Sequence, residues 1–249
     1  MAYDASALPD VSGLTVGIIG GTGDQGRGLA YRLARAGQRI LIGSRSAERA
    51  ADAAREIAAL PGVALLPGVA LLPGVAGDGV AGDGGVSGGA NADVAARSDI
   101  VVIAVPWAGH ADTVAGLREP LADKIVVDCV NPLGFDKQGP YPLQVEEGSA
   151  AQQAAALLPQ SRVCAAFNHV SAPLLADPDI ERIDLDVLIC AEDREAVGMV
   201  AALAARIPRM RGIYAGRLRN AHQVEALTAN LIAINKRYKA HAGIRVTDL

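Results

Sequence analysis

Residues 14–37 read LTVGIIGGTGDQGRGLAYRLARAG, and this stretch decides the fold. An apolar run at 14–19 is followed by a glycine-rich turn, and beyond the turn Leu29 and Leu33 recur at helical spacing. Gly37 then supplies the kind of residue that commonly ends a helix. The hydrophobic period thus changes from that of a buried strand to that of a helix, which predicts a strand–turn–helix unit.

The turn in this unit contains the pattern G-x-G-x-x-G at Gly21, Gly23 and Gly26. Because the pattern follows a strand and opens a helix, it predicts a dinucleotide-binding loop. Gly21 would permit the tight turn, Gly23 the approach of a diphosphate, and Gly26 close contact between helix and strand. Free N–H groups and the helix dipole would attract the diphosphate. The candidate residues are Gly20, Gly21, Thr22, Gly23, Asp24, Gln25 and Gly26. A glycine-rich turn without a ligand is the alternative.

The end of the second strand indicates which dinucleotide binds. NAD sites usually have Asp or Glu there, whereas residues 43–46 of this chain read GSRS and Arg49 follows one helical turn later. Arg side chains bind phosphate oxygens in pairs and stay charged. Ser44, Arg45 and Arg49 therefore predict a site for a 2′-phosphate, and hence for NADP(H). In the alternative interpretation, both arginines are surface charges.

The rest of the chain repeats the alternation of strands and helices. Continuous apolar runs occupy 100–105, 125–130, 163–167 and 187–190, and such runs are typical of strands buried on both faces of a parallel sheet. Further strands are expected at 39–42 and, as a short strand, at 210–215. Helical patterns occupy 47–60, 194–207 and 220–240. We expect an α/β fold, a Rossmann-type doubly wound and mainly parallel sheet. Its NADP-binding domain would span 1–169, and a small C-terminal α/β cap would span 170–249.

Residues 57–77 carry no charge over 21 positions, which is long enough to cross a membrane. Pro-Gly pairs interrupt this segment every six residues, and no helix survives such interruptions. The repeats LLPGVA and GVAGDG resemble a tandem duplication. We therefore expect a loop over 61–90, with the third strand reduced to a few residues near Val86, and no membrane association.

Composition excludes several classes of protein. The 249 residues are 51% hydrophobic with a net charge of −4, which is incompatible with a disordered chain. Cys129, Cys164 and Cys190 are widely spaced and lie in apolar runs, so we expect buried thiols without disulfides. Residues 1–9 lack the basic and apolar parts of a signal peptide, and we expect a cytoplasmic protein.

Charge is concentrated near the C-terminus. Residues 206–245 hold nine basic residues and one acid, Glu225. Small anions could bind there, but no zinc finger, aromatic-basic array or basic tail accompanies the cluster, so we expect no nucleic acid partner. Solvated helix faces are the alternative interpretation.

Residues for acid–base or metal chemistry are not evident. No Tyr is followed by Lys four residues later, as short-chain dehydrogenases require, and the four histidines form neither a triad order nor a metal-binding pattern. We therefore predict no catalytic side chain and no metal.

At this point the chain resembles the F420-dependent NADP oxidoreductases. The motifs that carry the resemblance are GGTG, GSR, VPW, KIVVDCVNPL, CAAFNHVSA and AGRLRNAHQVEALTANLIAIN. The resemblance implies reversible hydride transfer between NADP(H) and the deazaflavin F420, which carries a phosphodiester and a glutamate tail. It also implies NADP contacts by Thr22, Ser44, Arg45 and Arg49, and we expect a homodimer. Gln25 departs from the apolar residue that the family often has there.

Hydride transfer between two stacked rings requires placement rather than a proton donor. Three loops follow predicted strands and should converge on the nicotinamide, because ligands of such sheets bind at the carboxyl ends of strands. Their candidate residues are Val105, Pro106, Trp107, Asn131, Pro132, Asn168 and His169. Leu218 and Leu227 could cover the deazaflavin. In the alternative interpretations, the prolines only end strands, and Trp107 and both leucines belong to the core.

Two other functions share parts of this pattern. A soluble NADPH-dependent flavin or metal reductase would resemble the chain at FNHVSA and RLRNAHQVEAL. A non-catalytic NADP-sensing regulator would keep the glycines and Arg45 but would not need a second, apolar pocket.

Overall fold

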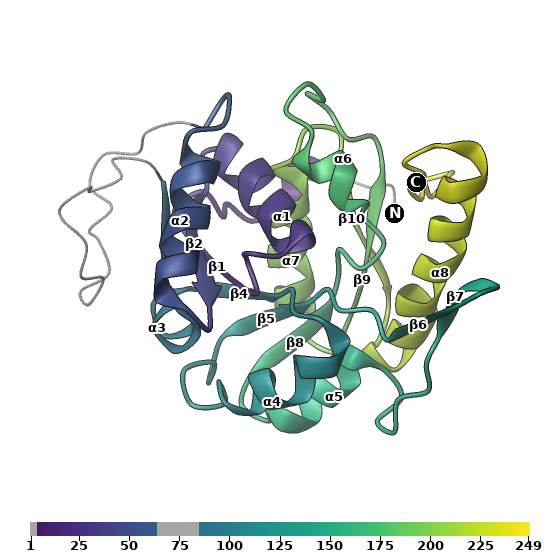
Figure 1. Ribbon diagram of the computed structural model, residues 1–249, viewed down its shortest axis with the longest axis horizontal. Coiled ribbons are helices and arrows are strands. Elements are labelled where there is room, and N and C mark those ends of the chain that lie inside the picture. The colour runs from purple at the N-terminus through teal and green to yellow at the C-terminus, as the bar shows by residue number, and fades with distance from the viewer. Residues whose placement is uncertain (1–3, 64–84) are drawn as a thin grey trace.

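The computed structural model describes residues 4–63 and 85–249. Eight strands form one sheet in the order β10-β9-β8-β5-β4-β1-β2-β3 (Figure 1). These strands are β1 Thr15–Ile19, β2 Arg39–Ser44, β3 Val86–Ala90, β4 Ile100–Ile103, β5 Ile125–Asp128, β8 Arg162–Ala165, β9 Asp186–Ala191 and β10 Arg211–Gly216. Neighbouring strands are parallel except β8 and β9, which pair antiparallel. The predicted mainly parallel, Rossmann-type sheet is confirmed.

Helices cover both faces of the sheet (Figure 1). They are α1 Asp24–Arg35, α2 Ala47–Ala58, α3 Asn91–Arg97, α4 His110–Ala115, α5 Ala150–Leu157, α6 Ala172–Ala176, α7 Arg194–Ala205 and α8 Ala221–Tyr238, with short 3₁₀ turns η1 Ala5–Ala7, η2 Trp107–Gly109 and η3 Leu218–Asn220. One hydrophobic cluster joins the sheet to α1, α2 and α7, and a second joins it to α3, α4 and α5. Strands buried on both faces follow from this layering, and every residue of β1 is buried.

The position of β1 creates the binding edge. β1 pairs with β2 on one side and with β4 on the other. The chain thus adds β2 and β3 on one side of β1 and then returns to add β4 and β5 on the other side. Ligands of such sheets bind at this switch point, beyond the carboxyl ends of the strands. The loops after β1, β2, β4, β5 and β8 therefore share one edge.

A small antiparallel hairpin was not expected from the sequence. β6 (Leu133–Asp136) and β7 (Gly139–Pro142) pair with each other and lie beside α8 (Figure 1). The Asp136 side chain accepts hydrogen bonds from the N–H groups of Gln138 and Gly139, and Gly139 has a φ of 124°. An Asp and a Gly at these turn positions are the local signal that could have predicted it.

The C-terminal part continues the main sheet. β9 and β10 join it beyond β8, and α7 packs on the same face as α1. The division of the chain at residue 169 stays a prediction.

One arginine connects the first helix to a distant segment. Arg32 on α1 is 3% exposed, and its guanidinium donates to the carbonyl oxygens of four residues. These are Leu174 (2.8 Å), Leu175 (2.8 Å), Asp177 (2.6 Å) and Ile180. A buried cation thus has carbonyl oxygens as partners, which offsets the cost of removing it from water.

The expected loop over 61–90 falls mostly outside the described residues, because the structure describes nothing of 64–84. The short third strand near Val86 is confirmed as β3. Among the described helices, none combines the length and the apolar composition needed to cross a bilayer.

Candidate functional site

The glycine loop between β1 and α1 is built from close backbone contacts. Gly20 has a φ of 77°, a conformation that favours glycine. A Cβ on Gly21 would lie 2.8 Å from the Ile18 oxygen, and a Cβ on Gly26 would lie 2.7 Å from the Gly21 Cα. Both positions therefore exclude larger residues, because backbone atoms fill the space.

Gly23 differs from these two glycines. It is the N-cap of α1 and is exposed, and an added Cβ would find only the Gly20 oxygen, at 3.5 Å. The fold thus leaves open space at Gly23, next to the free N–H groups of the first turn of α1. Thr22, Asp24 and Gln25 lie in the same turn. This arrangement can hold a diphosphate.

The loop after β2 presents two cations. Ser44 is buried at the end of β2, and its Oγ accepts a hydrogen bond from the Ser46 N–H (3.3 Å). Arg45 and Arg49 are exposed at the start of α2. Within the described part of the chain neither guanidinium has an ion pair. Two free guanidinium groups beside a hydroxyl suit a phosphate monoester.

A cavity of about 210 Å³ lies at the carboxyl ends of β4 and β5. Its lining includes the loop from Val105 to Trp107, the segment 129–131 and Gln25 from α1. The structure thus brings the predicted residues Val105, Pro106, Trp107 and Asn131 to the phosphate loop.

A larger cavity of about 520 Å³ adjoins the first. The two share Gln25 and Asn131 in their walls. The larger cavity lies between the loop after β8 and helix α8, and its lining includes Asn168 and His169. The sequence did not identify several other lining residues, namely Ser171, Pro173, Thr228, Leu231, Ile232, Asn235, Lys239 and His241.

The amide side chains shared by these walls have fixed orientations. Asn131 Nδ2 donates to the Asn168 carbonyl (2.7 Å), and Asn168 Nδ2 donates to the Val130 carbonyl (3.1 Å). Gln25 Nε2 donates to the Phe167 carbonyl (3.2 Å). The Oδ1 atoms of Asn131 and Asn168 are buried and have no partner among the described residues. Two hydrogen-bond acceptors are thus left to a ligand.

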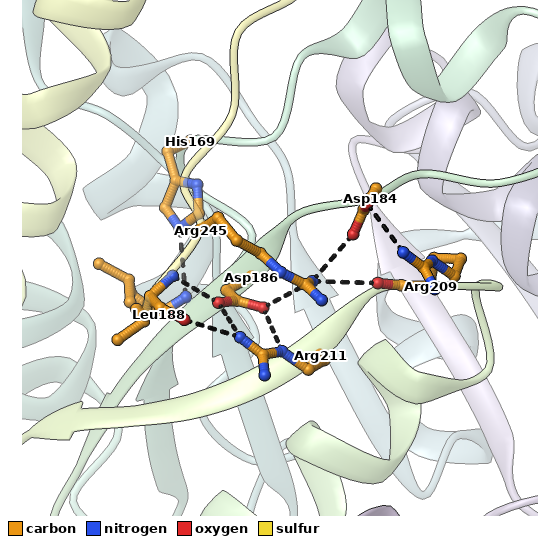
Figure 2. Close-up of polar contacts among 8 residues, drawn as sticks. His169, Asp184, Asp186, Leu188, Arg209, Arg211 and Arg245 are labelled. Carbon is orange, nitrogen blue, oxygen red and sulfur yellow. Dashed lines mark hydrogen bonds and ion pairs between the residues drawn. The ribbon is translucent and has the colours of Figure 1, made fainter. Parts of the chain in front are cut away.

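His169 supplies a donor to the same wall. Its Nε2 accepts a hydrogen bond from the Leu188 N–H of β9 (3.1 Å), so the ring proton is on Nδ1 (Figure 2). Burial lowers the pKa of His169 to about 4, so the ring is neutral at physiological pH. Nδ1 is buried and, among the described residues, has no acceptor. The unmatched donor and acceptors favour a ligand group that has both a carbonyl and an N–H.

The remaining predicted residues lie outside both cavities. Pro132 is buried directly after Asn131. Leu218 is 7% exposed and belongs to the core, and Leu227 is half-buried on α8. Thr228, one residue after Leu227, lines the larger cavity, whereas neither leucine does. The assignment of the two leucines to the deazaflavin stays a prediction.

The cysteines are buried and free, as expected. Cys129 lines the smaller cavity, and its thiol donates to the Ile103 carbonyl (3.1 Å). Burial raises the pKa of this thiol far above its ordinary value, because the thiolate would lose its hydration. Cys129 is therefore a packing residue rather than a nucleophile.

The basic segment 206–245 is largely paired. Arg209, Arg211 and Arg245 bind the carboxylates of Asp184 and Asp186 (Figure 2). Arg217 pairs with Glu192, and Arg206 donates to the Ala36 carbonyl. Five of the nine cations thus have partners within the fold. Arg219, Lys236, Arg237 and Lys239 are exposed, and Lys239 lines the larger cavity.

A glycine loop on a doubly wound sheet, exposed arginines after its second strand and two adjoining cavities are together typical of an NADP-dependent oxidoreductase. Residues 15–132 match the family model described as NADP oxidoreductase, coenzyme F420-dependent. An F420-dependent NADP reductase of Methanothermobacter thermautotrophicus is 37% identical to the chain, over 95% of this chain and 96% of the relative. The chain therefore belongs to the family of F420-dependent NADP reductases.

Two further comparisons agree with this assignment. A crystal structure described as a putative F420-dependent NADP reductase from Arthrobacter sp. FB24 has a TM-score of 0.72 and 25% identity, and the match covers 94% of this chain and 100% of that one. Metalloreductase STEAP3 of Rattus norvegicus is 30% identical over 87% of this chain, but the match covers only 37% of that protein. The chain thus matches only part of the metalloreductase, whereas it matches nearly all of the F420-dependent NADP reductase.

Proposed function

We propose that the two joined cavities hold the rings of NADP(H) and of coenzyme F420 side by side, so that a hydride passes directly between them. NADP(H) and F420 are the cofactors of the family to which the chain belongs. The observation that supports the proposal is that Gln25 and Asn131 line both cavities, so two cavities of different size adjoin at these residues. A protein that only binds NADP has no need of the second cavity.

The residues present fit NADP(H). The first turn of α1 would hold the diphosphate, and Arg45 and Arg49 with Ser44 would hold the 2′-phosphate. The smaller cavity, next to that turn, would take the nicotinamide against Trp107. The larger cavity would take the deazaflavin between the loop after β8 and α8. The imide edge of a deazaflavin and the carboxamide of a nicotinamide each carry the N–H and carbonyl that the wall of Asn131, Asn168 and His169 would match.

The protein contributes placement. When bound, the two cofactors supply a hydride donor and a hydride acceptor. Gln25 and Asn131, which face both cavities, would hold the rings in register, and the buried wall would exclude water. His169 is a neutral hydrogen-bond donor and Cys129 a buried thiol, so neither side chain is suited to proton transfer. The proposal therefore assigns neither of them the role of a catalytic acid or base.

Reduction of oxidised F420 by NADPH, followed by the loss of deazaflavin absorbance, tests the function. FMN and FAD are measured alongside under the same conditions. We expect F420 to be reduced with the highest kcat/KM. Equal or faster reduction of a flavin would contradict the assignment of the larger cavity, and NADPH binding without any turnover would indicate a regulator.

We also propose a cytoplasmic homodimer. Four exposed aromatic or aliphatic side chains support a subunit contact, with Phe135 (68% exposed) and Tyr141 on the hairpin and Ile234 and Tyr238 (73% exposed) on α8. Apolar side chains gathered on adjoining elements often mark a protein interface. Sedimentation equilibrium should give twice the chain mass, and a Phe135→Ser, Tyr238→Ser double variant should shift the distribution toward monomer. A monomeric native protein would contradict the proposal.

A further inference from the structure

His110 is fully buried, and both of its ring nitrogens face oxygen atoms. It is the first residue of α4 and is 0% exposed. Its Nε2 lies 2.6 Å from Asp128 Oδ2, and its Nδ1 lies 2.9 Å from Gln153 Oε1. A neutral imidazole has one donor and one acceptor nitrogen, so it cannot satisfy two acceptor oxygens at once.

The two partners are held so that they present acceptors. Gln153 donates its Nε2 to Glu147 Oε2 (3.2 Å), which directs Oε1 toward the ring. Asp128 accepts a hydrogen bond from the Val130 N–H on its other oxygen (3.0 Å). Both contacts are satisfied at once when the ring donates from both nitrogens, which is the hydrogen-bonding pattern of an imidazolium next to a carboxylate.

Among the described residues, the two groups that act electrostatically on this ring are both carboxyls. Asp128 on β5 is in direct contact, and Glu225 on α8 also acts on it through space. Burial lowers the pKa of His110, but the bonds to Asp128 and Gln153 and the two negative charges outweigh it, and the net pKa is raised. The charge environment thus agrees with the hydrogen-bond geometry.

This ring also supports the smaller cavity. The indole of Trp107 lies against it, with ring centroids 5.4 Å apart and planes tilted by 31°. Through Asp128, His110 also holds Val130, which lines that cavity beside Asn131. One side chain thus fixes two parts of the cavity wall, the η2 turn and the end of β5.

We propose that His110 is a positioning residue that works as a buried imidazolium, holding Trp107 and the end of β5 in place around the nicotinamide. It touches neither ring of the cofactors and acts through Trp107 and Val130. The role in turnover rests on the proposed function, whereas the charge state of the ring and its contact with Trp107 do not.

The charge state is tested first on the native protein. The chain has four histidines, so ¹⁵N-histidine NMR resolves few signals, which His→Gln variants assign. At neutral pH we expect His110 to carry a proton on each nitrogen and His169 to carry one on Nδ1 alone. A His110 ring with one unprotonated nitrogen overturns the inference. Variants of the other three histidines assign the His110 signal by elimination, so His110→Gln itself need not fold for this result.

Trp107 provides the second test, because it is the single tryptophan of the chain. Protonated imidazole quenches indole emission, so the fluorescence should rise with pH, with a midpoint above the ordinary value of about 6.5. His110→Gln should abolish this transition, and Asp128→Asn should lower its midpoint. His222→Gln, at an exposed position of α8, is the matched control and should keep the native curve. A native curve in His110→Gln overturns the inference.

Kinetics separate this inference from the function. A small displacement of aligned rings costs on the order of tenfold to a hundredfold in rate, so His110→Gln should lower kcat by that factor while His222→Gln leaves it unchanged. A wild-type kcat in His110→Gln overturns the positioning role. Failure of the proposed function would look different, because the native enzyme itself would then not reduce F420.

Discussion

His110 and His169 are both buried, yet their partners favour a cationic ring at His110 and a neutral ring at His169. His169 accepts a hydrogen bond from a backbone N–H, which a cationic ring could not do. His110 instead contacts two acceptor oxygens. The sequence contains both as single histidines in strand-following segments and does not distinguish them, because the difference lies in partners on β5, α5 and β9.

Glu225 gives a prediction for stability at the same scale. It is 2% exposed and accepts hydrogen bonds from the N–H groups of Ala150 and Ala151 at the start of α5. Burial nevertheless raises its pKa to about 7. The folded state therefore binds this proton more tightly than the unfolded state, so the contribution to stability is present at acid pH and is lost as pH rises toward 7.

We expect the free energy of unfolding to fall by up to a few kcal/mol between ~pH 5 and ~pH 8, and Glu225→Gln to flatten that dependence. Urea denaturation at several pH values measures it. Glu119→Gln, at an exposed position of the loop before β5, is the control and should leave the slope unchanged. Parallel curves for wild type and Glu225→Gln would show that the carboxyl is ordinary. The pKa of His110 is also raised in the folded state. Its contribution to the free energy of unfolding is therefore likewise lost as the pH rises above the pKa of an unfolded histidine, about 6.5.

Arg45 is the residue on which cofactor choice should depend. A charge-assisted phosphate contact is worth roughly 1.5–3 kcal/mol, so Arg45→Ala should weaken NADPH binding about tenfold or more and leave NADH nearly unchanged. Titration calorimetry with both dinucleotides measures this. Arg97→Ala, an exposed arginine at the end of α3, is the control. Equal losses for NADPH and NADH would contradict the 2′-phosphate assignment.

At the scale of elements, the two ends of the glycine loop should respond differently to substitution. Gly23→Val places a branched side chain in open space at the start of α1, so we expect the fold to persist and NADPH binding to be lost. Gly26→Ala forces a methyl group against Gly20 and Gly21 backbone atoms, so we expect a lower melting temperature. Circular dichroism and NADPH titration separate the outcomes. Unchanged affinity in Gly23→Val would remove this turn from the site.

Elements with a strong local period could be predicted. The helix expected between the glycine-rich turn and Gly37 is α1 at Asp24–Arg35, and the strand expected at 39–42 is β2 at Arg39–Ser44. Helices α3, α4 and α6 have 7, 6 and 5 residues, which is too short for a hydrophobic period to show. The antiparallel pairing of β9 with β8 was not predicted either. A strand buried on both faces is a continuous apolar run, and this pattern does not indicate the direction of the strand.

The residues of the candidate site also fall into those that the sequence could predict and those that it could not. Gly21, Arg45 and Asn131 could be found because each lies within three residues of the end of a strand. Thr228 and Leu231 line the larger cavity from α8, and only tertiary packing brings them to Asn168. The basic C-terminal segment indicated a place where small anions could bind. Three of its arginines instead pair with Asp184 and Asp186, and the sequence spacing does not reveal that these groups lie close together.

For the whole molecule, the pairing of most arginines in the basic segment 206–245 limits how strongly its charge can attract an anionic substrate. Exposed charges are screened over roughly 8–10 Å at ordinary salt. We expect the KM for F420 to rise modestly with ionic strength and kcat to stay constant. Lys239→Ala should reduce that dependence more than Arg219→Ala, because Lys239 lines the larger cavity. A KM independent of salt would leave the deazaflavin held by its ring alone.

The four carbonyl oxygens around Arg32 bear on how the protein is synthesised. The guanidinium is on the helix that follows the glycine loop, while its acceptors lie between 174 and 180. A nascent chain that ends before these residues has a cation on α1 with no partner to bury it. The nucleotide-binding half should therefore not reach its native packing until most of the chain has left the ribosome. A released fragment of residues 1–169 should accordingly show fast amide exchange in α1, and slow exchange there would show that this half folds during translation.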